Sequence, residues 1–266
     1  MALINNARNP VLFIGHGSPM FALEPGPAGE ALIALGQTLP QPLGVVVISP
    51  HWETDVPTVG AAAAPETIHD FSGFDPRLDA LQYRANGNPQ ASQTVITALQ
   101  AAGLTAHTDE TRGLDHGAWV PLRYLMPDPD QPIVPLSIQH QGGPEHAYRV
   151  GQAIAPLADQ GWMIVASGNI THNLNDWRAT GNGAALDAEY AQSFADWVHK
   201  QLMQRQPSDL LNYRQLHPDA QRAHPRDEHL LPLFTAMGAA GPEFQASVIH
   251  RGIRDHVIAM DSYLFS

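Results

Sequence analysis

Short hydrophobic runs rich in β-branched residues recur along the chain, and segments with helical spacing separate most of them. Runs of this kind predict strands buried on both faces, as in a parallel sheet with helices above and below. The predicted strands are Val11–Gly15, Gly44–Ser49, Thr58–Ala63, Leu104–His107, Ile133–Ile138, Met163–Ser167 and Phe244–Ile249.

The helical segments place apolar residues three to four positions apart, which is the spacing of one helix face. The predicted helices are Ala28–Leu35, Pro89–Ala102, Glu145–Ala158, Leu186–Gln204 and Asp227–Met237, with a short one ending near Leu125. His69–Asp75 and Thr111–Trp119 are expected to be loops. This alternation predicts an α/β fold, a single domain over residues 1–266 whose central, mostly parallel or mixed sheet is flanked by helices.

Three of the predicted strands lead into a histidine, and these are His16, His51 and His172. In sheets of this class the ligand crevice lies beyond the carboxyl ends of the strands. We therefore expect the three imidazoles to meet at one point, although they lie more than 150 residues apart. Metal sites are often assembled in this way.

The composition of the 266 residues narrows the function. Hydrophobic residues make up 44% and charged residues 15%, which is typical of a globular protein. No apolar run approaches the ~20 residues that span a bilayer. The first ten residues, MALINNARNP, show no signal peptide, so a cytoplasmic location is expected.

Cysteine is absent, so any transition metal must be held by imidazole and carboxylate, which suits non-haem iron, zinc or manganese. The net charge is −12, and Lys200 is the only lysine. Nucleic acid and anionic membranes are therefore not expected as partners. The fourteen histidines are the compositional anomaly that directs attention to a metal.

The segment HPRDEHLLPL carries two further histidines, His224 and His229. Pro225 fits the first position of a helix, which would make His224 the cap and place His229 in the first turn. Their spacing of five does not match the i, i+4 pairing of a helical two-histidine motif. We expect only one of them to face the site, with Glu228 as an alternative carboxylate ligand.

Loop residues supply the remaining candidates. His116 in GLDHGAW and His69 in HDFSGF are flanked by Asp, Gly and aromatic residues, so each is either a site residue or a loop histidine held by its neighbouring Asp. Trp52 and Phe71 could line an aromatic pocket or pack in the core. Glu53 could orient His51.

Six motifs in order, GHGSP, SPHWE, HDFSGF, GLDHGAW, SGNITHNL and HPRDEHLLPL, resemble those of the class III extradiol ring-cleaving dioxygenases of the DOPA-dioxygenase type. They span residues 15 to 233. The resemblance implies a single α/β domain with one metal ion per chain, which is Fe(II) for ring cleavage, although Zn(II) is often found in its place.

Carried over residue by residue, the resemblance implies that His16 and His51 are the first two metal ligands and that His229 is the third. His172 matches a histidine that acts as a further ligand or as the acid/base. His116 matches a pocket histidine that binds substrate or moves protons.

The chain departs from the better-studied ring-cleaving branch, in which two histidines and one carboxylate hold the iron. Here the resemblance implies His229 as the third ligand, with Glu228 or His224 as alternatives. A set made only of histidines suits Zn(II) as well as Fe(II), so the sequence leaves the metal open.

The leading functional hypothesis is extradiol cleavage of a catechol by O2, of the 4,5-DOPA type, to a muconic semialdehyde. His172 or His116 would act as the base, because imidazole titrates near neutral pH. His116, Trp52 and Phe71 would bind the substrate. The alternatives are a zinc-dependent hydrolase and a non-catalytic metal-binding member of the family. The sequence does not determine the oligomeric state, for which a homodimer is one option.

Overall fold

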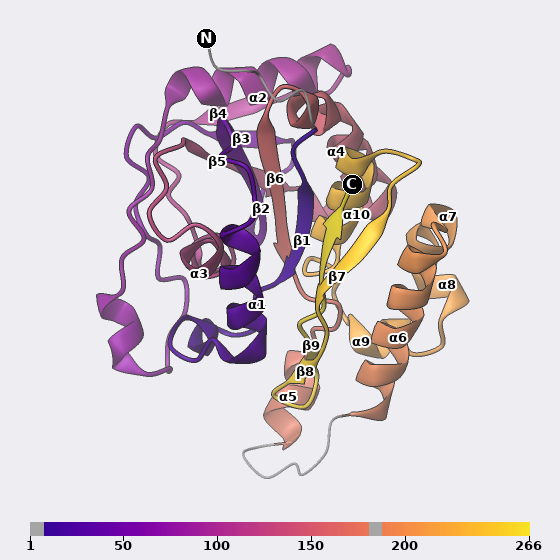
Figure 1. Cartoon of the computed structure of the whole chain (residues 1–266). Coiled ribbons are helices and arrows are strands. Elements are labelled where there is room, and N and C mark those ends of the chain that lie inside the picture. The colour runs from indigo at the N-terminus through magenta and orange to yellow at the C-terminus, as the bar shows by residue number, and fades with distance from the viewer. Residues whose placement is uncertain (1–7, 181–187) are drawn as a thin grey trace.

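The computed structural model describes residues 8–180 and 188–266, and its centre is an eight-stranded sheet (Figure 1). The strand order is β4-β3-β5-β2-β6-β1-β10-β7. The strands are β1 Val11–Gly15, β2 Gly44–Glu53, β3 Thr58–Gly60, β4 His107–Asp109, β5 Ile133–Ile138, β6 Trp162–Gly168, β7 Ala246–His250 and β10 Ser262–Phe265. A separate hairpin pairs β8 Ile253–Arg254 with β9 Ile258–Ala259.

The middle of the sheet is parallel and its flanks are mixed. Strands β5, β2, β6 and β1 run parallel to one another, and their β-branched side chains are buried on both faces. On one side β3 pairs antiparallel with β5, and on the other β10 and β7 add two antiparallel strands. The prediction of an α/β domain with a mixed sheet is confirmed.

Helices cover both faces of the sheet (Figure 1). The helices α1 Gly26–Gly36 and α3 His116–Leu125 pack on one face with the 3-10 turn η1 Pro19–Ala22. The helices α2 Pro89–Ala101, α4 Gly143–Asp159 and α10 Leu231–Ala240 pack on the other. The remaining helices are α5 Leu174–Thr180, α6 Glu189–Met203, α7 Pro207–Leu211, α8 Tyr213–Leu216 and α9 Ala220–Ala223, with the 3-10 turns η2 Pro76–Ala80 and η3 His140–Gly142.

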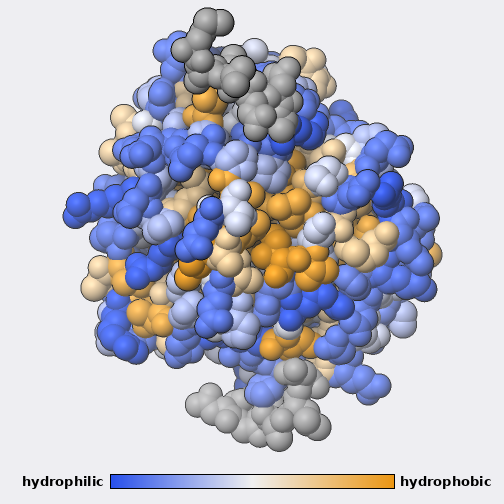
Figure 2. Space-filling model, in the orientation of Figure 1, coloured by the Kyte–Doolittle hydropathy of each residue, from blue (hydrophilic) through white to orange (hydrophobic). Residues whose placement is uncertain are grey.

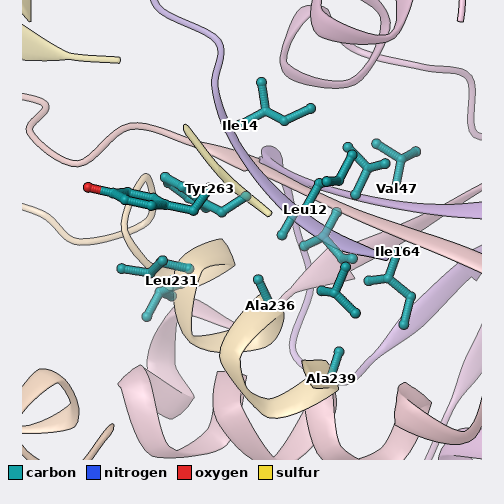
Figure 3. Packing of buried hydrophobic residues seen from close by; sticks show 14 of the residues in the cluster. Leu12, Ile14, Val47, Ile164, Leu231, Ala236, Ala239 and Tyr263 are labelled. Atoms are coloured by element: carbon teal, nitrogen blue, oxygen red, sulfur yellow. The ribbon is translucent and has the colours of Figure 1, made fainter. Parts of the chain in front are cut away.

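Part of the hydrophobic core lies between the sheet and α10 (Figure 3). Leu12 and Ile164 from the sheet meet Leu231, Ala236 and Ala239 from the helix, and all five are at most 1% exposed. The small side chains of the two alanines let the helix axis lie close to the strands. The face of the molecule seen in Figure 1 is mostly hydrophilic, with hydrophobic residues gathered near its middle (Figure 2).

Three predicted boundaries on the sheet side were wrong. β2 continues to Glu53, so His51 lies within the strand, where the register with β5 is irregular between Ile48 and Glu53. β4 is His107–Asp109, because it pairs with β3 rather than continuing the preceding apolar run. The predicted loop over 111–119 already contains the start of α3, where the Asp115 side chain accepts from Ala118 N at 3.2 Å as a cap.

The predicted helix Asp227–Met237 was also wrong at its start. α10 begins at Leu231 with Pro232 in its first turn, so the second proline of the segment, not Pro225, occupies that position. His224 instead follows α9 as its C-cap residue, and His229 lies in the turn before α10.

Other boundaries moved by a few residues. The late strand is Ala246–His250, two residues later than predicted at its start. The predicted helix Leu186–Gln204 corresponds to α6, and its first two residues lie outside the described part of the chain. Within that described part, no helix is long and apolar enough to cross a membrane.

Candidate active site

His16 and His51 come from neighbouring parts of the sheet and meet at its carboxyl edge. His16 follows β1, and its backbone N–H donates to Gly168 O of β6 at 3.0 Å, so the strand pairing continues to the histidine. Gly17 then turns the chain with φ +63°, a left-handed conformation that suits glycine. Nε2 of His51 lies 3.3 Å from Nε2 of His16. The prediction that these two histidines meet is confirmed.

Two further histidines pack against this pair. The His116 ring centroid lies 4.0 Å from that of His51 and 5.5 Å from that of His16. The His229 ring lies 4.9 Å from His51 and 5.3 Å from His16. His172 stacks on His229 at 3.5 Å with the rings 12° from parallel. His172, the third of the histidines predicted to follow a strand, therefore contacts the cluster through His229.

Potential ligand atoms fall into two groups of three whose members lie within 4.8 Å of one another. The groups are His16 with His51 and His116, and His172 with Glu228 and His229. His16, His116 and His229 are buried, at 0%, 6% and 4% exposure. The side chains of His51 and His172 are 21% and 11% exposed, so the cluster opens to solvent past these two.

Asp70 lies behind two of the rings. It accepts from the His116 backbone N–H at 2.9 Å, and both of its oxygens lie 3.0 Å from His116 Nδ1. One of those oxygens is 3.6 Å from His51 Nδ1. Burial alone would raise the pKa of Asp70, but the hydrogen bonds from His116 and the nearby His51 hold it well below its usual range.

Glu228 and Ser167 occupy the corresponding places behind the other rings. Oε1 of Glu228 lies 2.9 Å from His229 Nδ1 and 3.8 Å from His172 Nδ1. Oγ of Ser167 lies 2.9 Å from His16 Nδ1. Because Nδ1 of His16, His116 and His229 lies within hydrogen-bond distance of a partner on this outer side, Nε2 is the nitrogen that these three rings leave for the interior of the cluster.

Four histidines of the cluster, His16, His51, His172 and His229, are held neutral. Burial, reinforced by the neighbouring histidines, lowers the pKa of His16 and of His229 well below the ordinary value. The same causes lower the pKa of His51 and of His172 to about 3, although Asp70 partly opposes the shift at His51. Neutral imidazoles keep a ring lone pair at physiological pH, which is the form that binds metals.

These residues fit a divalent metal. At metal–nitrogen distances of roughly 2.0–2.1 Å, two imidazole nitrogens on one tetrahedral ion lie ~3.4 Å apart. The 3.3 Å between Nε2 of His16 and Nε2 of His51 matches this separation. Without a cation or a proton between them, two such lone pairs would repel each other.

The aromatic candidates have different surroundings. The Phe71 ring meets His116 edge-on at 5.7 Å, which places it beside the cluster. Trp52 is 8% exposed, and the Arg112 guanidinium lies over its ring at 5.0 Å. His69 does not join the cluster, since its Nε2 lies 2.9 Å from Leu81 O and holds the loop.

Two expectations about partner groups were wrong. Glu53 does not orient His51, because its carboxylate is bound by Arg226. His224 is not available as a ligand in place of His229, since it is fully buried with its Nε2 2.7 Å from Ile170 O. Asn173 caps α5, because its side-chain oxygen accepts from the backbone N–H groups of Asn175 and Asp176.

Sequence reasoning missed Asp70 and Ser167. Asp70 directly follows His69 within HDFSGF, so a carboxylate inside a histidine motif was the available signal. Ser167 had no local signal, because a serine near the end of a buried strand is common and only the pairing of β1 with β6 brings it to His16.

The sequence is similar to a family of ring-opening dioxygenases along almost its whole length. The family model described as the catalytic LigB subunit of aromatic ring-opening dioxygenase matches residues 12–265. A 4,5-DOPA dioxygenase extradiol of Beta vulgaris is 37% identical over 258 residues, which cover 96% of this chain and 95% of that protein. A protein of the same name from Escherichia coli K12 is 38% identical over 240 residues, covering 89% and 87%.

A solved structure shows the same fold. The crystal structure of an uncharacterized protein from Escherichia coli K12 matches with a TM-score of 0.82 at 33% identity, covering 97% of this chain and 99% of that one. The family consists of non-haem metal-dependent enzymes that open aromatic rings, so neither a hydrolase nor a non-catalytic metal-binding protein is favoured. The match over almost the whole length, together with a histidine cluster at the carboxyl edge of the sheet, shows that this chain belongs to the LigB family of extradiol aromatic ring-opening dioxygenases.

Proposed function

We propose that this protein cleaves a catechol with O2 at an extradiol position, of the 4,5-DOPA type, to give a muconic semialdehyde. The observation that carries the proposal is the convergence of His16, His51, His116 and His229 on one small volume at the sheet edge. The relatives that bear the name 4,5-DOPA dioxygenase support a catechol with an amino-acid side chain as the substrate.

His16, His51 and His229 are the proposed metal ligands. Glu228 behind His229 strengthens that imidazole as a ligand, because a carboxylate on Nδ1 raises the basicity of Nε2. His116 is the first residue of the ten-residue helix α3, and the positive end of a helix disfavours a cation and favours an anion. His116 therefore suits the oxygen of a bound catecholate better than it suits the metal.

His172 is the proposed acid/base. A ring lone pair lies in the plane of its imidazole, and His172 is nearly parallel to His229 at a distance of 3.5 Å. The lone pairs of the two rings therefore lie in nearly parallel planes and do not converge. This stacking supports a role in proton transfer for His172, which is neutral because its pKa is lowered to about 3 by burial and the neighbouring histidines.

The metal is proposed to be one Fe(II) per chain. When bound by His16, His51 and His229, Fe(II) would supply the redox chemistry that the reaction with O2 requires, which Zn(II) cannot do because it has no redox chemistry. His116 would accept a phenolic proton at Nε2, and His172 would return a proton to the product side. Phe71 beside His116 would pack against the catechol ring, with Trp52 as a further wall of the pocket.

The experiment is anaerobic reconstitution with Fe(II), with Zn(II) and without metal, followed by addition of O2 and a panel of catechols that includes L-DOPA. We expect stoichiometric O2 uptake and a yellow semialdehyde only with Fe(II). Folded protein that binds Fe(II) but takes up no O2 with any catechol of the panel would contradict the proposal.

Two further parts of the proposal concern the cellular context. We place the protein in the cytoplasm and test this by fractionation of cells that produce it from its own gene. We also propose that the protein forms a homodimer. Light scattering at micromolar protein concentration would measure the molar mass of the assembly.

A further inference from the structure

The Asp70 carboxylate lies close to a ring nitrogen of each of two histidines, which belong to different secondary-structure elements. His51 belongs to β2 and His116 begins α3, and their ring centroids lie 4.0 Å apart. Nδ1 of His116 lies 3.0 Å from both Asp70 oxygens, and Nδ1 of His51 lies 3.6 Å from one of them. Asp70 is therefore near Nδ1 of both rings at the same time.

We propose that Asp70 is a positioning residue that keeps the ring proton of both His51 and His116 on Nδ1, so that both Nε2 lone pairs face the shared pocket. An ionised carboxylate can only accept hydrogen bonds, so Nδ1 of His116, 3.0 Å away, must carry the proton. Nδ1 of His51 lies 3.6 Å away, beyond hydrogen-bond length, and there the negative charge of the carboxylate favours the proton on Nδ1 over Nε2. The choice of Nδ1 for the proton leaves Nε2 unprotonated, as metal binding and proton abstraction both require. The assignment of these two tasks rests on the proposed function.

The alternative tautomer would be harmful at His51 in particular. With its proton on Nε2, His51 would donate across the 3.3 Å gap to Nε2 of His16. That hydrogen bond would use both of the nitrogens that are proposed to hold the metal. Asp70 is the described group within ion-pair distance of His51 Nδ1 that opposes this arrangement.

The loop that carries Asp70 is fixed to the start of α3. Ile68 N donates to Leu114 O at 2.7 Å, and Trp119 Nε1 donates to Ile68 O at 3.1 Å. The His116 backbone N–H then donates to Asp70 itself at 2.9 Å. These bonds fix the loop to the segment in which α3 begins. The distance between the Asp70 carboxylate and the His116 ring is therefore set by the backbone of both residues.

Replacement of Asp70 by asparagine separates a tautomer role from simple space filling. The amide oxygen can keep the two donors of His116, which leaves the amide N–H group facing His51. This group is a donor and carries no negative charge, so it favours a lone pair on His51 Nδ1 and the ring proton on Nε2. Asp70→Ala removes the partner without imposing the wrong tautomer.

The test is the ring tautomer of His51 and His116 in the metal-free protein, read from 15N chemical shifts of the imidazoles and assigned with single histidine variants. We expect Nδ1–H for both rings in the unchanged protein, and Nε2–H for His51 in Asp70→Asn. Asp75→Asn removes a carboxylate from the same loop, where it caps η2 and pairs with Arg77, and is expected to change neither ring.

Metal affinity is measured on the same proteins by competition with a chromogenic chelator, using Zn(II) and Co(II). We expect Asp70→Asn to weaken binding roughly 10–100-fold and at least as much as Asp70→Ala, while Asp75→Asn binds normally. Nε2–H tautomers in the unchanged protein, or an Asp70→Asn protein with full metal affinity, would overturn the inference.

These readouts do not depend on ring cleavage. A protein with the expected tautomers and metal affinities that nevertheless cleaves no catechol would retain the role of Asp70 and refute the proposed function. A protein that cleaves catechols but shows the opposite tautomers would support the proposed function and refute the role of Asp70.

Discussion

The rings of His172 and His229 stack 3.5 Å apart and only 12° from parallel, so their lone pairs point along parallel planes rather than toward one ion. His229 is buried and the His172 side chain is 11% exposed, and both approach the same carboxylate, Glu228. Their proximity would make either one a plausible ligand if distance were the only criterion. Ring orientation is the basis on which we propose His229 as a metal ligand and His172 as a proton-transfer group.

This separation predicts different losses for the two alanine variants. His229→Ala should lower metal affinity by at least about 10-fold and abolish ring cleavage, because it removes a ligand. His172→Ala should bind metal normally but lose roughly 10²–10⁴ in kcat, the usual contribution of a general acid or base. Metal content after dialysis and steady-state O2 uptake measure the two effects.

The exposed His107 supplies the control for these histidine variants, and His107→Ala should match the unchanged protein in both assays. If His172→Ala loses its metal while His229→Ala retains it, the two assignments must be exchanged.

His116→Gln tests the substrate side of the cluster. The position is at the positive end of α3 and beside Phe71, so we expect the loss to fall on catalysis with a bound catechol rather than on metal binding. The variant should retain its metal and lose roughly 10²–10⁴ in kcat. Loss of metal from this variant, with its fold intact by circular dichroism, would assign His116 as a ligand.

Gly168→Ala should move His229 without touching its side chain. A Cβ at this position would lie 2.3 Å from the His229 carbonyl oxygen, closer than packing allows. We expect a loss of about 1–3 kcal/mol in the free energy of unfolding, together with weaker metal binding. Chemical denaturation and chelator competition measure the two quantities.

Gly36→Ala is the matched control, because its Cβ would lie 2.1 Å from the Leu125 carbonyl oxygen at the end of α3 opposite His116. It should cost comparable stability and leave metal affinity unchanged. Equal losses of metal affinity in both variants would indicate general destabilisation instead of displacement of His229.

Buried His224 should make stability depend on pH. Burial lowers its pKa to about 4, while the unfolded chain binds this proton near the ordinary pKa of 6.5. The unfolded state therefore binds more protons between these values, so stability is complete above pH 6.5 and falls as the pH drops toward 4. The contribution of this one residue across that window is about 3 kcal/mol.

His224→Gln keeps a donor for Ile170 O but cannot titrate. Its unfolding free energy, measured in urea at several pH values, should decline less steeply below pH 6.5 than that of the unchanged protein. Parallel curves for the two proteins would show that another group carries the dependence.

The hydrophobic pattern was sufficient to predict the central strands, because β-branched runs such as Val11–Gly15 and Ile133–Ile138 are buried on both faces in any sheet of this class. It was insufficient at the start of α10. Pro225 and Pro232 both fit the first turn of a helix, and only the packing of Leu231 onward against the sheet selects the second. Local preferences of similar strength are decided by tertiary contacts.

The sequence by itself determined the class of fold and the use of imidazole instead of thiolate for a metal. It also identified His16 and His51, which follow predicted strands, as site candidates. These follow from features that short segments carry on their own: the period of apolar residues, the absence of cysteine, and a histidine at the end of a strand.

Only the tertiary structure decided how the other groups are used. Asp70 reaches His51 and His116 because one loop is bonded to the start of α3, and His229 reaches His16 because the turn before α10 crosses the end of β6. The orientation of a ring or the choice of a hydrogen-bond partner depends on contacts between segments far apart in the chain, which local spacing does not encode.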